Sequence, residues 1–269
     1  MNKKILSLLG VCVIALTTGC GANNSTPTQS NTQTQGNTPI PSVPNSTSSI
    51  ISSSREITDL PTEDGWFYYM DELGNEYKGQ FVNGLYNGYG TMLYADSTMY
   101  EGTWVDGVKE GSGKIYWNSG CLYVGEMHDD LMHGAGYMLY PMGDYYYGDF
   151  KYGQITGYGT KAFLRDATGA THAKKYDIYT GEMQDGYLHG YGTMQYYFGG
   201  VFTGNYEMNI RTGYGVYIWE ETDDPNIPWT VFEGNFANDW ISGEGTLYFK
   251  DGTSKTGTFD GNALPLTAE

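Results

Sequence analysis

The chain has 269 residues, with 31 acidic side chains against 14 basic ones and a formal net charge of −17 at pH 7. This acidity disfavours nucleic acids and anionic lipid headgroups as ligands, because both are bound through basic patches. Glycine and tyrosine are abundant, with 39 and 26 copies.

Residues 1–20 have the pattern of an export signal. Lys3 and Lys4 precede an apolar run that is too short to remain as a membrane-spanning helix. The small residues before Cys20 resemble a bacterial lipoprotein box, although Thr17 stands where leucine is usual. We therefore predict that Cys20 is lipidated and begins the mature chain. Ordinary secretion without a lipid is the alternative.

Residues 21–55 consist mostly of Ser, Thr, Asn, Gln, Pro and Gly. Such a segment cannot bury enough apolar surface to offset its ordering entropy, so a disordered tether is predicted. Together with the lipid, it predicts an exported protein held at the cell membrane or cell surface without spanning the bilayer.

From Tyr77 onward the sequence repeats with a period of 23 residues, which indicates one supersecondary unit stacked on its neighbours. Counting the first residue of each repeat as position zero, the repeats begin at Tyr77, Tyr100, Tyr123, Tyr146, Tyr179, Phe202, Phe232 and Lys255. The two longer intervals place insertions near 164–178 and 220–231.

Each repeat is predicted to form a β-hairpin, because residues two apart share a face of a strand. Position zero, the glycine at two and the large apolar residue at four lie on one face of the first strand. After a loop such as Gly84–Gly88, the glycine at thirteen and an aromatic at seventeen share a face of the second strand. We expect the rings to lie over the glycines.

The spacing Tyr-x-Gly-x-aromatic-x-x-Gly-x-x-x-Gly-x-Gly-x-x-x-aromatic, present from about residue 66 to 260, resembles the MORN repeat family. Asp130, Asn209 and Asp239 replace the loop glycine at position seven, and all three tolerate left-handed turns. The resemblance implies an all-β fold, an elongated single-layer antiparallel sheet of stacked hairpins with one concave face. It also implies protein interaction or self-association more often than catalysis, so a protein partner or a homo-oligomer is expected.

The predicted organisation therefore has five parts. These are a lipoprotein signal peptide at 1–20, a disordered tether at 21–55, an N-terminal cap hairpin at 56–76, seven full repeats and a partial eighth at 77–262, and a C-terminal tail at 263–269.

Position twelve carries a second tyrosine column, at Tyr89, Tyr158, Tyr191 and Tyr214, with Ser112, Ala135 and Glu244 in other repeats. Parity places this column on the face opposite the glycines at thirteen. Amphipathic rings in a row suit peptide or sugar binding. The alternative is that tyrosine only covers the backbone of a half-buried strand.

The segment Gly65-Trp66-Phe67-Tyr68-Tyr69 resembles the aromatic hairpin of choline- and cell-wall-binding repeats. It makes Trp66 a further candidate binding residue, and carbohydrate or cell-wall binding the alternative function. The same segment could instead cap the first hairpin.

Catalytic and metal-binding patterns are weak. His128, His133, His172 and His189 lack metal-ligand spacing, and the paired glycines do not form a phosphate loop or a dinucleotide fingerprint. The acidic cluster at 220–224 matches no calcium loop. We therefore predict a non-enzymatic protein with no cofactor and no metal.

Overall fold

The computed structural model describes residues 59–166, 175–219, 228–261 and 267–268. The predicted signal peptide, lipidated Cys20 and tether lie outside the described residues, as does the acidic cluster at 220–224. Among the described residues, no helix has the length and apolar character needed to cross a membrane.

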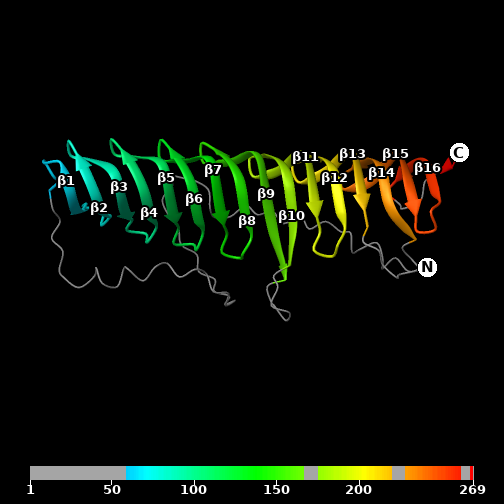
Figure 1. Ribbon diagram of the computed structural model, residues 1–269, viewed down its shortest axis with the longest axis horizontal. Coiled ribbons are helices and arrows are strands. Elements are labelled where there is room, and N and C mark those ends of the chain that lie inside the picture. Colours follow the sequence, from blue (N-terminus) through cyan, green and yellow to red (C-terminus); the bar gives the residue numbers. More distant parts are fainter. Residues whose placement is uncertain (1–58, 167–174, 220–227, 262–266, 269) are drawn as a thin grey trace.

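The described residues form one antiparallel sheet in which each strand pairs with its neighbours in sequence order, so the strands line up in a long row (Figure 1). The strands are β1 Gly65–Met70, β2 Glu76–Val82, β3 Leu85–Leu93, β4 Met99–Val105, β5 Val108–Tyr116, β6 Leu122–His128, β7 Leu131–Leu139, β8 Tyr145–Lys151, β9 Gln154–Asp166, β10 Lys175–Gln184, β11 Tyr187–Gln195, β12 Val201–Glu207, β13 Ile210–Ile218, β14 Trp229–Ala237, β15 Trp240–Phe249, β16 Ser254–Asp260 and β17 Thr267–Ala268. The predicted all-β hairpin array is confirmed.

Within each repeat the hairpin turn has two residues, both with positive φ, as in Asn83 (51°) and Gly84 (77°). This is the type I′ geometry whose twist matches that of the flanking strands. Asp130, Asn209 and Asp239 adopt φ of 67°, 72° and 70°, so the expectation of left-handed turns is confirmed at all three.

The predicted loop over Gly84–Gly88 is wrong. β3 already begins at Leu85, and the register shifts between Gly79 and Gln80 because Gly88 (φ 62°) belongs to a β-bulge. The two extra residues of the bulge, Gly88 and Tyr89, lie inside the second strand and not in the loop.

The buried face is built from rings lying over paired glycines. Gly79 lies opposite Gly90, and a Cβ added to Gly90 would lie 2.2 Å from the hydroxyl oxygen of Tyr77. The tyrosines at position zero are fully buried, and each donates its hydroxyl to the carbonyl three residues later, at 3.2, 2.9, 2.6, 3.1 and 2.8 Å for Tyr77, Tyr100, Tyr123, Tyr146 and Tyr179. The expected packing of rings over glycines is confirmed.

Neighbouring repeats share one continuous core. The Tyr77 ring meets Phe81 of its own repeat edge-on at 5.2 Å and Trp104 of the next repeat at 5.6 Å. The backbone joins the repeats as well, since the N–H of Gly107 donates to the carbonyl of Tyr86 at 2.9 Å. A hairpin that is unstable alone is thus held by its neighbours.

The two ends of the row differ from its interior. At β1, Phe67 lies opposite Gly79, where interior strands pair glycine with glycine, and its ring packs edge-on against Phe81. At β16, the far edge pairs with β17 through Gly257 and Ala268. At both ends, therefore, a side chain lies opposite the glycine where interior strands pair glycine with glycine.

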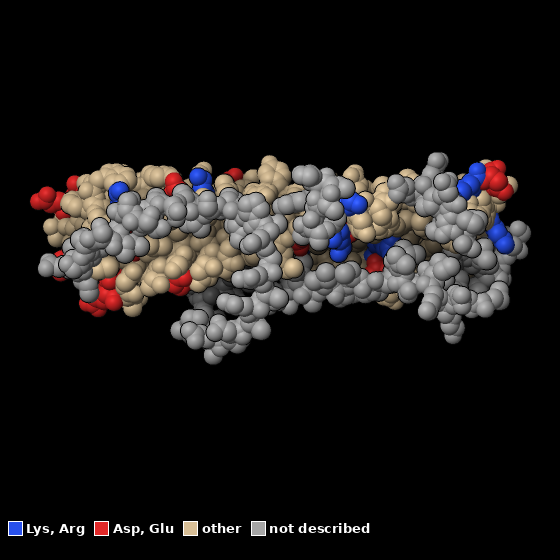
Figure 2. Space-filling model, turned by 90° about the horizontal axis from the view of Figure 1, so that it is seen from below, with Lys and Arg blue, Asp and Glu red and all other residues tan. Residues whose placement is uncertain are grey.

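The first insertion prolongs one hairpin. β9 and β10 extend beyond the neighbouring strands and pair as far as Asp166 and Lys175 (Figure 1). Asp177 is buried there, and it accepts hydrogen bonds from Arg165 Nε at 2.6 Å and from the Tyr197 N–H at 2.8 Å. Viewed from below, basic side chains gather near the middle of the row and toward its C-terminal end (Figure 2).

Candidate binding surface

The face opposite the buried rings carries the position-twelve column. Tyr89, Tyr158, Tyr191 and Tyr214 lie there with between 52% and 58% of each residue exposed. An exposed tyrosine on a strand is ordinary when alone, but a repeated row of them on one face is a candidate contact surface.

Trp66 belongs to the same column. It lies opposite Gln80 on β2, just as Tyr89 lies opposite Thr103 on β4, and it is 61% exposed. The available sequence signal was that Trp66 stands one 23-residue period before Tyr89. We call Trp66, Tyr89, Tyr158, Tyr191 and Tyr214 the outer aromatic stripe.

The β-bulge fixes the backbone from which these side chains project. At Tyr158, the N–H donates to Asp149 Oδ2 at 2.9 Å, and at Tyr191 it donates to Glu182 Oε1 at 3.1 Å. The carboxylate at position three therefore satisfies a donor that the bulge removes from the ladder. These contacts hold the backbone that carries Tyr158 and Tyr191.

Two of the stripe hydroxyls donate to carboxylates of the next repeat. Tyr89 donates to Glu101 Oε1 at 2.5 Å, and this hydrogen bond raises the Tyr89 pKa to about 12. Tyr214 donates to Glu233, which likewise raises its pKa. These pairs orient the two rings.

Beside the stripe, position fourteen of one repeat meets position one of the next. Three of these pairs are threonines, whereas others hold larger side chains such as Tyr137 and Tyr147. Hydroxyl pairs close across the strands at 3.1, 3.0 and 2.9 Å for Thr160–Thr180, Thr193–Thr203 and Thr246–Thr256. We call these three pairs the threonine strip. Their side chains are shorter than the tyrosine rings beside them, and their hydroxyls satisfy one another.

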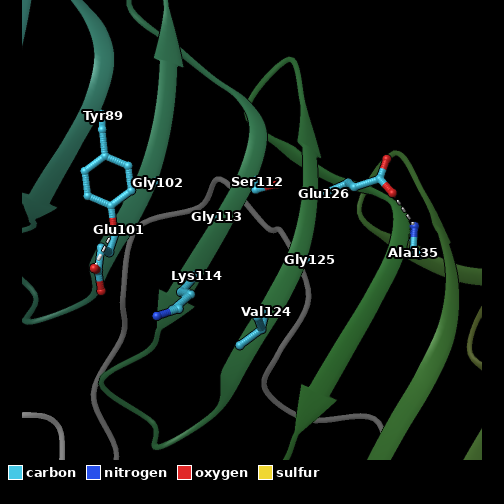
Figure 3. Close-up of a pocket in the computed structure, with 10 residues that line it drawn as sticks. All are labelled: Tyr89, Glu101, Gly102, Ser112, Gly113, Lys114, Val124, Gly125, Glu126 and Ala135. Carbon is cyan, nitrogen blue, oxygen red and sulfur yellow. Dashed lines mark hydrogen bonds between the residues drawn. The ribbon is translucent and has the colours of Figure 1, made fainter.

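The stripe is interrupted where position twelve is Ser112 or Ala135. A shallow hollow of about 380 Å³ lies there, with the glycine backbones of β4–β6 as its floor (Figure 3). Tyr89 stands at one end and Glu126 at the other, and Lys114 and Val124 lie between them (Figure 3). The hollow thus combines one aromatic ring with carboxylates and an amine.

One cluster on the edge of the hairpin turns has metal-ligand chemistry. Glu110, His128 and Asp129 offer ligand atoms within 4.8 Å of one another. His128 Nδ1 lies 3.1 Å from Glu110, whose carboxylate raises the His128 pKa. This ion pair explains the cluster on its own, so we assign no metal to it.

A family model of the MORN repeat matches residues 77–99, 100–122, 123–145, 146–163, 179–200, 202–221 and 232–254, which is more than half of the chain. The chain belongs to the MORN repeat family. The predicted resemblance is confirmed. The comparison with curated proteins gives no match.

Two solved structures match part of this chain at low identity. The SAS-4 (dCPAP) TCP domain of Drosophila melanogaster, in complex with a proline-rich motif of Ana2 (dSTIL), is 13% identical, with a TM-score of 0.33, and the match covers 77% of this chain and 96% of that one. The TCP10 domain of Danio rerio CPAP, in complex with a STIL peptide, is 10% identical, with a TM-score of 0.37, and the match covers 72% and 84%. Identity and superposition are low in both.

Proposed function

We propose that this MORN array is a non-enzymatic, surface-displayed scaffold that binds another protein through the outer aromatic stripe. One observation carries the proposal: five exposed aromatic side chains from five different strands occupy equivalent register positions on one face. Exposed aromatic residues in a row are typical of contact surfaces, because each offers a large apolar area and a polar tip. Membership of a repeat family supports a binding role, since stacked repeats present extended surfaces.

Display at the cell surface is the second part of the proposal. A lipid on Cys20 would fix the chain at the membrane, and residues 21–55 would give the array reach. Metabolic labelling with a fatty acid tests this. We expect label in the wild-type chain and none in a Cys20→Ala variant, and an unlabelled wild-type chain would contradict the lipoprotein assignment.

Crosslinking at the surface of intact cells tests the protein-binding role. We expect a discrete crosslinked partner that is lost from a Tyr158→Ser, Tyr191→Ser, Tyr214→Ser variant. Tyr147→Ser is the matched control, because Tyr147 is 61% exposed but occupies position one and not the stripe. Retention of the partner by the triple variant would exclude the stripe as the contact surface.

A second copy of the chain is the other protein partner to consider. Among the described residues, β1 pairs with β2, and Phe67 of β1 stands at the position where interior strands use glycine. That side chain disfavours continuation of the array by another copy. Light scattering of the full chain at tens of micromolar distinguishes the cases, and a mass above that of the monomer would support self-association.

Carbohydrate or cell-wall binding is the second candidate function, and the hollow at Ser112 and Ala135 favours it. An aromatic ring beside carboxylates and an amine can stack on a sugar and hydrogen-bond its hydroxyls. Cosedimentation of the full chain with isolated cell-wall polymer tests this function. Saturable binding that free sugar competes away and that Ser112→Trp blocks would support it, whereas absence of sedimentation would exclude it.

A further inference from the structure

The C-terminal half of the outer aromatic stripe has a regular spacing. Tyr158, Tyr191 and Tyr214 come from β9, β11 and β13, so two strand steps separate each ring from the next. Neighbouring strands lie about 4.8 Å apart, which places the rings about 10 Å apart along the row. A ligand that lies along the row must therefore offer a matching group about every 10 Å.

Among regular backbone conformations, polyproline II matches this interval best. It has three residues per turn and rises about 3.1 Å per residue, so the same side of the peptide returns about every 9 Å. An extended β-strand returns to the same face after about 7 Å, and an α-helix advances about 5.4 Å per turn. A strand would lose register with the rings within two steps. An α-helix, which advances about 10.8 Å in two turns, would be about 2 Å out of register there.

The charge on this part of the face selects the peptide further. Glu182 and Glu233 lie beside the three rings, and their carboxylates are exposed. The stripe, the threonine strip and position three carry no Lys or Arg between Tyr158 and Asn235, among the residues that the structure describes. Basic side chains on the peptide would meet both carboxylates and ring faces, which attract cations.

We propose that Tyr158, Tyr191 and Tyr214 bind a basic peptide segment in polyproline II conformation, lying across the strands with every third residue over a ring. The proposal rests on the protein-binding function above and specifies the chemistry of the partner segment. The low threonine strip gives the peptide backbone room beside the rings, and its hydroxyls close on one another instead of demanding partners. Recognition of this preformed conformation by aromatic residues has a small entropic cost.

Titration of the purified full chain with two synthetic peptides tests the proposal. The first repeats Pro-Pro-Arg and the second repeats Gly-Gly-Arg, so length and charge match while only the first prefers polyproline II. We expect saturable binding of the first peptide by calorimetry and at least tenfold weaker binding of the second. Equal affinities would show attraction by charge alone and would overturn the proposal.

Variants locate the site. Replacing the three tyrosines by serine should weaken binding of the Pro-Pro-Arg peptide by at least tenfold. Tyr152→Ser should leave it within about twofold, because Tyr152 is 60% exposed but lies in the hairpin turn between β8 and β9, outside the contact. An unchanged circular dichroism spectrum shows that the triple variant remains folded. If neither peptide binds although the tyrosine variant still loses its crosslinked partner, the proposed function stands and this inference fails.

Discussion

Replacing Gly192 by alanine tests the packing of rings over glycines that builds the array. A Cβ at Gly192 would lie 2.3 Å from the hydroxyl oxygen of Tyr179 and 2.4–2.5 Å from two of its ring carbons. The ring cannot move aside freely, because Tyr179 is fully buried and its hydroxyl donates to the carbonyls of Glu182 at 2.8 Å and His189 at 3.2 Å.

The expected destabilisation follows from those contacts. Overpacking of a filled core costs about 1–3 kcal/mol. Displacing the ring also breaks the hydroxyl's hydrogen bonds, which adds about 1 kcal/mol. The free energy of unfolding should therefore fall by about 2–4 kcal/mol. Because each repeat contacts only its neighbours, the loss should be concentrated around β10–β12.

Urea unfolding followed by circular dichroism measures the change, and hydrogen exchange locates it. Gly186→Asn is the matched control, because a side chain there would meet nothing within 4 Å and asparagine tolerates its φ of +82°. The equivalent position is already Asn209 in the next repeat. An unchanged urea midpoint for Gly192→Ala would refute the reasoning about rings over glycines.

Three further outcomes are expected. Tyr179→Phe should lower the free energy of unfolding by about 1 kcal/mol in urea, through loss of its hydroxyl hydrogen bonds, and a larger fall would indicate a role beyond them. Tyr152→Asn should raise it by about 0.5–1 kcal/mol, because a bulky residue is strained at the φ of +50° found there; destabilisation would contradict this. Burial raises the pKa of the position-zero tyrosines, such as Tyr100, well above the unfolded value of 10.0. Their contribution to stability should be complete below pH 10 and should be lost as the pH rises further. Tyrosinate absorbance of these residues should therefore increase together with the loss of the circular dichroism signal. Ionisation of these residues in a chain that is still folded would contradict this prediction.

Much of the fold could be predicted because the repeat makes the same physical demand many times. Tyrosine at position zero and glycine at two and thirteen fix which face is buried, and the structure agrees at Tyr77, Gly79 and Gly90. Residues at position seven indicated the turn because few side chains accept a left-handed conformation, as at Asp130.

One feature escaped prediction because it depends on a contact between repeats. Arg211 lies on the buried face with its guanidinium 5.4 Å from the Phe202 ring centre, where a cation is unexpected from the pattern alone. Asp239 of the next repeat accepts from Arg211 Nε at 3.1 Å and thereby compensates the buried charge. Trp66, in contrast, was a candidate from the sequence, and the pairing of β1 with β2 places it opposite Gln80, in the register of the stripe.

The positions that build the fold and those that could bind a ligand are separated by the bulge. Contacts between rings and glycines constrain the residues at positions zero, two, four and thirteen. The residue types at these positions are therefore explained by the stability of the fold. Position twelve projects from the same bulge to the other face, and the array folds there with Tyr89, Ser112, Ala135 and Glu244 alike. Its side chains are therefore free to differ between repeats without loss of the core. The buried packing does not require tyrosine at position twelve, yet Tyr158, Tyr191 and Tyr214 are found there. This is the physical reason to look for a ligand on this face.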